Sequence, residues 1–233
     1  MTDLDAFDRF LANTRFQWHR SFEAASTRRL LGGAFSRTQL AMLTLQMFHY
    51  VKYTVPVFEE ALARVAEGAA HEPLRAMLRF FAEDEAGHDR LALRDLARMG
   101  YDPEQCAASL PLPATLDLHG ANRLAVAEYG PYYLVGETYA TETVGAEISR
   151  RIERAYAGVA EVSFYAVHAE ADVGHAARSE EIVRHALTLP GTEGAITLGY
   201  LTALHNLQRL AEAVEDSAPF PAAFQLPAAR AIS

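Results

Sequence analysis

Apolar residues recur at steps of three and four along nearly the whole chain of 233 residues, and alternating runs typical of β-strands are scarce. This periodicity places apolar side chains on one face of each of a series of helices. Such helices must pack on one another to bury those faces, so the sequence predicts an all-α fold. The length suits one domain with a sizeable core.

Capping residues, prolines and glycines divide this pattern into about seven helices. The ranges are 3–30 (one or two helices), 36–67 with a kink at Pro56, 73–99, 121–157 with a break at Gly130-Pro131, 160–188 and 193–215. We expect the proline-rich stretch 101–120 to be a loop. Residues 1–216 are then a single helical domain, and the Pro- and Ala-rich residues 217–233 are an extended tail.

Composition excludes several classes of protein. The formal net charge is -9 and there is no basic run, which argues against nucleic-acid partners and against docking on an anionic membrane. No segment is apolar for 18 residues, and the acidic start MTDLDAFDRF does not resemble a signal peptide. Cys106 is the only cysteine, so no intrachain disulfide can form, and we expect a cytoplasmic, reducing location.

The strongest local motif is His168-x3-Asp172-x2-His175. On a helix, steps of four and seven keep side chains within about 60° of one another, so all three groups share one face. Apolar residues precede the motif, and three ionisable groups on a buried stripe are costly unless paired or metal-bound. Mixed nitrogen and oxygen ligands suit a metal such as Fe(II). An exposed helix face with incidental histidines is the alternative.

A second motif is Glu85-x-x-His88, an i,i+3 ligand pair typical of di-iron helical bundles, although it also occurs by chance on exposed helices. We expect the adjacent Glu83 and Asp84 to be solvated. Gly87 costs roughly 1 kcal/mol within a helix relative to alanine, which a close helix contact or a ligand would explain.

The region after the break at 130–131 offers three further carboxylates, Glu137, Glu142 and Glu147. Each of them alone is better explained as a surface residue, and their own sequence context does not distinguish them.

The chain resembles the haem-oxygenase-like di-iron oxidases and oxygenases. Four stretches carry the resemblance, in the family's order and at close to its intervals: QMFHYVKYT (46–54), EAGHDRLALRDL (85–96), YATE (139–142) and HAEADVGH (168–175). The resemblance implies a seven-helix haem-oxygenase-like bundle that holds two iron ions. By position, the ligands it implies are Glu85, His88, Glu142, His168, Asp172 and His175. Three carboxylates leave one net positive charge at a diferrous site and leave coordination positions open for O2 and substrate.

One position departs from the family pattern. Some members place a carboxylate seven residues before the equivalent of His88, where this chain has Phe81, so Glu85 takes that role. Where other members add an acid from the preceding helix, this chain has His49, Tyr50 and Tyr53, which either line the pocket or pack in the core. Asp95 either orients a ligand histidine or forms an ordinary salt bridge.

The activity implied by the resemblance is reduction of O2 to a peroxo-diferric species that oxidises a small metabolite. We favour N-oxygenation of an amine-bearing substrate, because an acidic, tyrosine-rich pocket suits a cation. The alternative reaction is oxidative C–C cleavage or desaturation of an amino or fatty acid. The family also implies a homodimer, and the source of electrons, including an external donor, stays open.

Other functions remain to be distinguished. A haem oxygenase would need a proximal histidine early in the chain, such as His19, and a thiaminase-type hydrolase would need a catalytic cysteine, which only Cys106 offers. A cofactorless oxidase resembling the pyrroloquinoline-quinone synthesis enzyme would not need this number of carboxylates. A non-catalytic iron-binding helical protein is an alternative from a different class. We predict that Glu83→Ala and Glu137→Ala are mild beside changes to the ligands.

Overall fold

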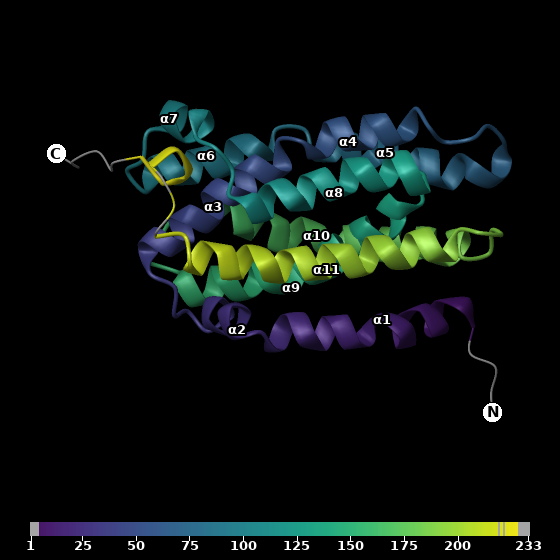
Figure 1. Ribbon diagram of the computed structural model, residues 1–233, viewed down its shortest axis with the longest axis horizontal. Coiled ribbons are helices and arrows are strands. Elements are labelled where there is room, and N and C mark those ends of the chain that lie inside the picture. The colour runs from purple at the N-terminus through teal and green to yellow at the C-terminus, as the bar shows by residue number, and fades with distance from the viewer. Residues whose placement is uncertain (1–4, 219, 221, 228–233) are drawn as a thin grey trace.

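The computed structural model describes residues 5–218, 220 and 222–227, except for the side chains of residues 171–173. Helices make up most of the described residues, which contain no strand; this confirms the all-α prediction. The long helices run side by side along the longest axis of the molecule (Figure 1). The elements, in chain order, are α1 (Ala6–Glu23), α2 (Ala25–Leu31), α3 (Arg37–Val51), α4 (Thr54–Leu62), η1 (Ala69–His71), α5 (Glu72–Asp84), α6 (His88–Arg98), α7 (Pro103–Ala108), α8 (Pro113–Tyr129), α9 (Tyr133–Tyr156), α10 (Ser163–Ala186), α11 (Glu193–Glu215) and η2 (Ala222–Phe224).

The described part of the chain forms eleven α-helices instead of about seven, because predicted helices are divided. The helix expected over 36–67 begins with the predicted capping box at Ser36 but breaks before α4, so Pro56 lies in the first turn of α4 rather than at a kink. The expected loop over 101–120 instead contains α7 and the start of α8. Pro103 and Pro113 each occupy the first turn of a helix, where a proline costs no hydrogen bond.

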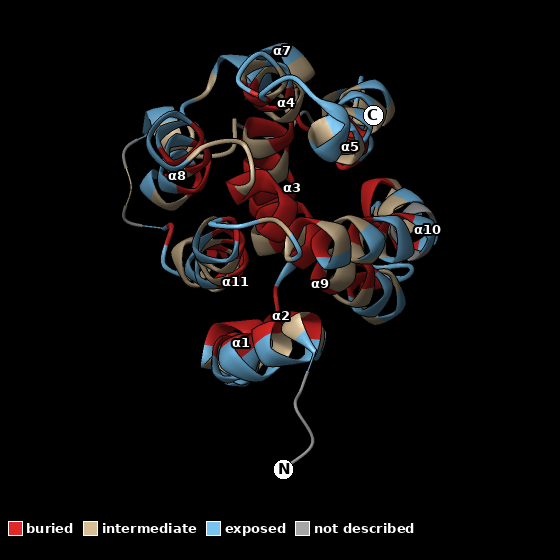
Figure 2. Cartoon of the chain, turned by 90° about the vertical axis from the view of Figure 1, so that its right-hand side faces the viewer, coloured by how far each residue is buried: buried red, intermediate tan, exposed pale blue. Residues whose placement is uncertain are grey.

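α9 is central to the arrangement, because it packs against both α10 and α11. The end view shows α10 on one side of α9 and α11 on the other, with α3 buried in the middle of the bundle (Figure 2). Two glycines bring the backbones of α9 and α11 into contact. A Cβ atom at Gly136 would lie 1.8 Å from the carbonyl oxygen of Ile196, and one at Gly199 would lie 2.0 Å from that of Tyr133.

The described residues after α11 fold back onto the bundle. The backbone N–H of Leu110 donates to the carbonyl of Ala223 at 2.8 Å, and Phe220 and Phe224 pack on the apolar core around α3 and α6. Among the described residues, no helix has the length and apolar character needed to cross a bilayer.

Candidate metal centre

A break between α5 and α6 places the first two predicted ligands. α5 ends at Asp84, Glu85 caps it, and α6 begins at His88. Gly87 has a φ of 95°, a left-handed conformation that glycine adopts without steric cost. The continuous helix predicted over 73–99 is therefore wrong, and Gly87 lies in the break between the two helices, directly before the first residue of α6. The pairing nevertheless forms, with Glu85 Oε2 at 3.0 Å from His88 Nδ1.

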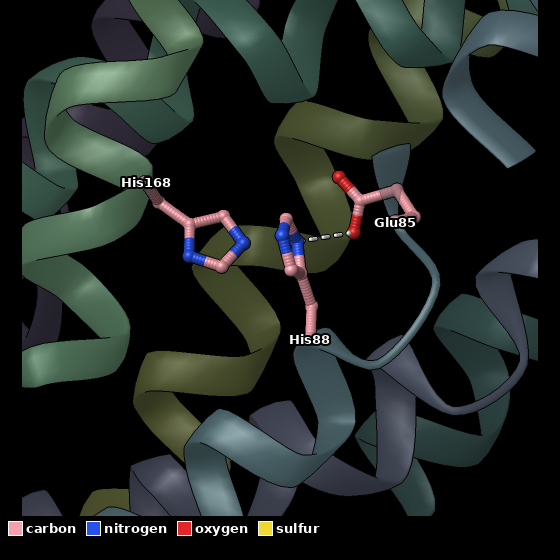
Figure 3. Close-up of side chains that lie close together, drawn as sticks. All are labelled: Glu85, His88 and His168. Carbon is pink, nitrogen blue, oxygen red and sulfur yellow. Dashed lines mark hydrogen bonds and ion pairs between the residues drawn. The ribbon is translucent and has the colours of Figure 1, made fainter. Parts of the chain in front are cut away.

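His168 reaches the same point from α10. One donor atom from each of Glu85, His88 and His168 lies within 4.8 Å of the others, and Figure 3 shows the three side chains converging from separate segments. His168 Nδ1 lies 2.7 Å from the carbonyl oxygen of Phe164. A carbonyl oxygen can only accept, so Nδ1 must carry the hydrogen and donate it. Nε2 then has no hydrogen, and its lone pair is available to a metal. Burial lowers the pKa of His168, so the imidazole is neutral, the form that binds a metal.

Glu142 and His175 form a second pair beside the first. Glu142 Oε2 on α9 lies 3.2 Å from His175 Nδ1 on α10, and His175 Nε2 lies 3.4 Å from Asp84 Oδ2. Burial raises the pKa of Glu142 to about 7. The neighbouring carboxylate of Glu142 raises the pKa of His175. We expected Asp84 to be solvated, but it faces His175, a predicted ligand. Its carboxylate lies beside Nε2, the ring nitrogen of His175 that does not face Glu142.

The two pairs are close enough to interact. Burial is the main cause of the raised pKa of Glu142, and the negative charge of Glu85 raises it further. Burial is also the main cause of the lowered pKa of His168, and the charge of His175 lowers it further. His168 and His175 lie two turns apart on one face of α10. Asp172 falls between them, but its side chain is outside the described residues, so its predicted role stays a prediction.

The donor set fits metal ions. Two donor atoms that bind one ion at about 2.1 Å and at a right angle lie about 3.0 Å apart. The separations of 3.0 Å and 3.2 Å in the two Glu–His pairs match this geometry. Imidazole and carboxylate donors together suit Fe(II). The burial of Glu142 and His175 would be costly for the free carboxylate and imidazole, and a shared cation offsets that cost.

Glu137 is a buried acid that the sequence prediction placed on the surface. It is 3% exposed and accepts hydrogen bonds from Tyr50 Oη at 2.8 Å and from Asn122 Nδ2 at 2.9 Å. Burial raises its pKa. A signal was present in the sequence, because the stretch YLVGETYA surrounds Glu137 with apolar and aromatic residues on every face of the helix. Glu147 is partly exposed and pairs with neighbouring arginines.

The residues suggested for the pocket separate into two groups. Tyr50 lines a cavity of about 140 Å³, together with Glu85, Glu137, Glu142 and His168. Tyr53 does not line this cavity; it contacts a smaller neighbouring one and stacks on a histidine ring.

His49 and Asp95 do not line the main cavity either. His49 is buried, with Nε2 at 3.0 Å from Ser109 Oγ, so it joins α3 to the end of α7. Asp95 is fully buried and accepts hydrogen bonds from the backbone N–H of Phe164 at 2.7 Å and from the hydroxyl of Ser163. Among the residues that the structure describes, Asp95 has neither a ligand histidine as a hydrogen-bond partner nor a cationic side chain as a salt-bridge partner. It caps the start of α10.

The residues that rival functions would need lie elsewhere. His19 is exposed on α1, where its ring accepts a hydrogen bond from Arg15, and so cannot hold a haem in the core. Cys106 is buried in α7 and is absent from the walls of the main cavity. Burial raises its pKa to about 11, which disfavours the thiolate that a nucleophile requires.

These features define a helical protein with a histidine- and carboxylate-lined candidate metal centre in its interior. The sequence pattern of the family described as iron-containing redox enzyme matches residues 42–211. The chain belongs to this family.

Solved structures support the same fold. The chain resembles a domain of unknown function with a haem-oxygenase-like fold from Shewanella denitrificans, at 19% identity and a TM-score of 0.80, covering 93% of this chain and 94% of that one. It also resembles a TenA homologue from P. horikoshii, at 13% identity and a TM-score of 0.75, with 92% and 100% covered. A CADD-like protein of unknown function from Nostoc punctiforme gives 19% identity and a TM-score of 0.66, with 91% and 98% covered. No curated protein matches the chain.

Proposed function

We propose that this chain is a non-haem di-iron enzyme that activates O2 to oxidise a small metabolite. The observation that carries the proposal is the convergence of two Glu–His pairs and His168 from three helical regions. Glu85, Glu142 and His168 of this set line one cavity. When bound, two Fe(II) ions would supply the electrons and open coordination positions that reduction of O2 requires. The full ligand set we propose is Glu85, His88, Glu142, His168, Asp172 and His175.

The protein's own contribution is to hold these ligands and shape the cavity. The hydrogen bond from His168 to the carbonyl of Phe164 fixes which nitrogen faces the cluster. Asp84 Oδ2 lies 3.4 Å from His175 Nε2 and would orient that ring. Because mostly apolar side chains line the rest of the cavity, a substrate that enters displaces water from the reacting centre.

The cavity walls favour an amine-bearing substrate and hence N-oxygenation. Glu137 lines the cavity without being among the proposed ligands, and the described walls contain no lysine or arginine. An amine can form a hydrogen bond with the carboxyl group of Glu137, whereas a free carboxylate group finds no cationic side chain to pair with. Oxidative C–C cleavage or desaturation of an amino or fatty acid remains the alternative, with the substrate acid bound to the metal instead.

Iron loading tests the proposal directly. We expect anaerobically loaded protein to hold about two Fe(II) ions per chain, and to consume O2 in the presence of a substrate chosen from amines, amino acids and fatty acids. Glu142→Ala and His175→Ala should each lower the iron content and abolish O2 consumption while helical circular dichroism is retained. Glu83→Ala, at an exposed neighbouring position, is the matched control.

The outcomes separate the rival functions. Two retained irons and full turnover in the Glu142 or His175 variant would refute that ligand. Iron bound without O2 consumption by any substrate tested would favour an iron-binding protein without turnover. A Soret band in the purified protein would indicate haem instead.

A further inference from the structure

The main cavity extends from the candidate metal centre across the bundle to two helices that contribute no predicted ligand. Besides the acids and His168, its walls include Thr27 on α2 and Gln208 on α11. In the end view, α11 lies on the opposite side of α9 from α10, and α2 lies below α9 and α11 (Figure 2). The cavity therefore has an end near the cluster and a second end remote from it.

The space between the two ends is apolar. Leu43, Met47, Ile148 and Leu210, from α3, α9 and α11, are among the residues that line it. An apolar cavity of about 150 Å³ is large enough for a benzene ring, and this one measures about 140 Å³. Because this volume includes both ends of the cavity, it suits a ligand of roughly seven or eight non-hydrogen atoms in all, with its polar groups counted.

Two polar atoms at the remote end have no partner within the described protein. Thr27 Oγ1 and Gln208 Oε1 are both buried without a hydrogen bond, and the Thr27 residue is 6% exposed. Thr27 is the third residue of α2, so this helix has no preceding turn whose carbonyl could accept a hydrogen bond from its hydroxyl. Buried polar atoms are almost always hydrogen-bonded, so these two require a partner that enters the cavity.

The orientation of Gln208 determines what that partner must offer. Its Nε2 donates to the carboxylate of Glu212 at 2.8 Å. A carboxylate only accepts hydrogen bonds, so the amide cannot be turned the other way while this contact is kept. The atom left for the cavity is the carbonyl oxygen, an acceptor, and the Thr27 hydroxyl can accept as well as donate. The remote end is therefore built for a hydrogen-bond donor.

We propose that Thr27 and Gln208 form a subsite that binds a neutral hydrogen-bond donor, such as a hydroxyl or amide N–H, at the far end of the substrate. The ligand class is a short apolar chain or ring with its amine at the acidic cluster and a donor group at the opposite end. The assignment rests on the proposed function only for which end of the ligand faces the metal centre.

A matched pair of probes tests the subsite without iron or turnover. 6-Aminohexan-1-ol and n-heptylamine have the same number of non-hydrogen atoms and differ in a terminal hydroxyl or methyl group. Their dissociation constants are measured by calorimetry on the full-length, iron-free chain and on a Thr27→Val/Gln208→Leu double variant. We expect the preference for the hydroxyl probe over the methyl probe to fall about tenfold in the variant, the value of one hydrogen bond.

Controls keep the result interpretable. Thr14→Val removes a buried hydroxyl on α1 that donates to the carbonyl of Phe10 and lies outside the cavity, and it should leave the preference unchanged. Thr27→Val alone, which exchanges a hydroxyl for a methyl group, should lower the preference about threefold and replaces the double variant if that does not fold.

An unchanged preference in folded variants overturns the subsite, as does the failure of both probes to bind the wild-type chain. Because the assay contains no iron, these failures are distinct from a failure of the proposed function, which the iron stoichiometry reports separately.

Discussion

Replacing Gly136 by alanine should separate the two helices that carry the wall of the candidate site. The added Cβ would lie 1.8 Å from the carbonyl oxygen of Ile196 and 3.0 Å from the backbone nitrogen of Tyr200, where ordinary contact begins at 3.4 Å. Both neighbours are backbone atoms, so no rotamer change can relieve the overlap. α9 and α11 would have to move apart by roughly 1.6 Å, and a gap of 0.5–1 Å already forfeits a quarter to a half of each contact.

The cost should be at the upper end of overpacking effects, about 3 kcal/mol or more. For a chain of this length that corresponds to a fall in Tm of about 6–12 °C. Differential scanning calorimetry on iron-free protein measures it without interference from metal binding. Gly199→Ala, which meets the carbonyl of Tyr133 at 2.0 Å, should give a similar loss from the other side of the same contact.

Gly120→Ala is the matched control. Gly120 lies exposed within α8, and a Cβ there would meet no atom within 4 Å. Alanine is a better helix former than glycine, so this variant should gain about 0.5–1 kcal/mol. If Gly136→Ala melts at the wild-type temperature, or Gly120→Ala is the more damaging change, the close approach of α9 and α11 is not as described.

Two further predictions concern buried carboxylates. Burial raises the pKa of Glu137 above its ordinary 4.5, so its protonated form contributes stability below that pH, and this contribution is lost as pH rises through the raised value. The Tm of iron-free Glu137→Gln relative to wild type should therefore increase from pH 5 to pH 8, and a difference that does not vary with pH would contradict this. Asp95→Asn keeps an acceptor for the N–H of Phe164 but loses the charge and the second acceptor that Ser163 uses; it should cost about 1.5–3 kcal/mol. We also expect Asp95→Asn to bind iron more weakly, as measured by titration. A wild-type free energy of unfolding together with a wild-type iron affinity would show that the cap is unimportant.

Much of the fold could be predicted because helix ends have local causes. The capping box at Ser36 and the left-handed glycine at 130 both act within a few residues, and the structure confirms both boundaries. The breaks at 52–53 and 85–87 were missed because the apolar periodicity continues across them. The prolines of 101–120 were interpreted as a loop although two of them begin helices.

The site was predictable in part for a different reason. Spacing on α10 places His168 and His175 on one face from helical geometry alone, but no local signal places Glu85 beside His168, because their contact depends on packing of α6 against α10. The family resemblance supplied that contact. The contact of Asp84 with His175 and the capping role of Asp95 are set by tertiary packing, which a single sequence does not reveal. For the burial of Glu137, the apolar residues around it gave a local signal.

One pair of helices, α6 and α10, explains how His88 and His168 are held relative to each other. α6 begins with His88, and about two turns later the same helix presents Asp95, which caps the start of α10. His168 lies one turn into α10 and bonds back to Phe164, the residue that Asp95 holds. The separation of the two imidazoles is thus fixed by α6 and its cap, the rigid support that a preorganised site requires. Glu85 lies outside both helices, at the C-cap of α5, and its carboxylate joins the two imidazoles through the contact with His88 at 3.0 Å.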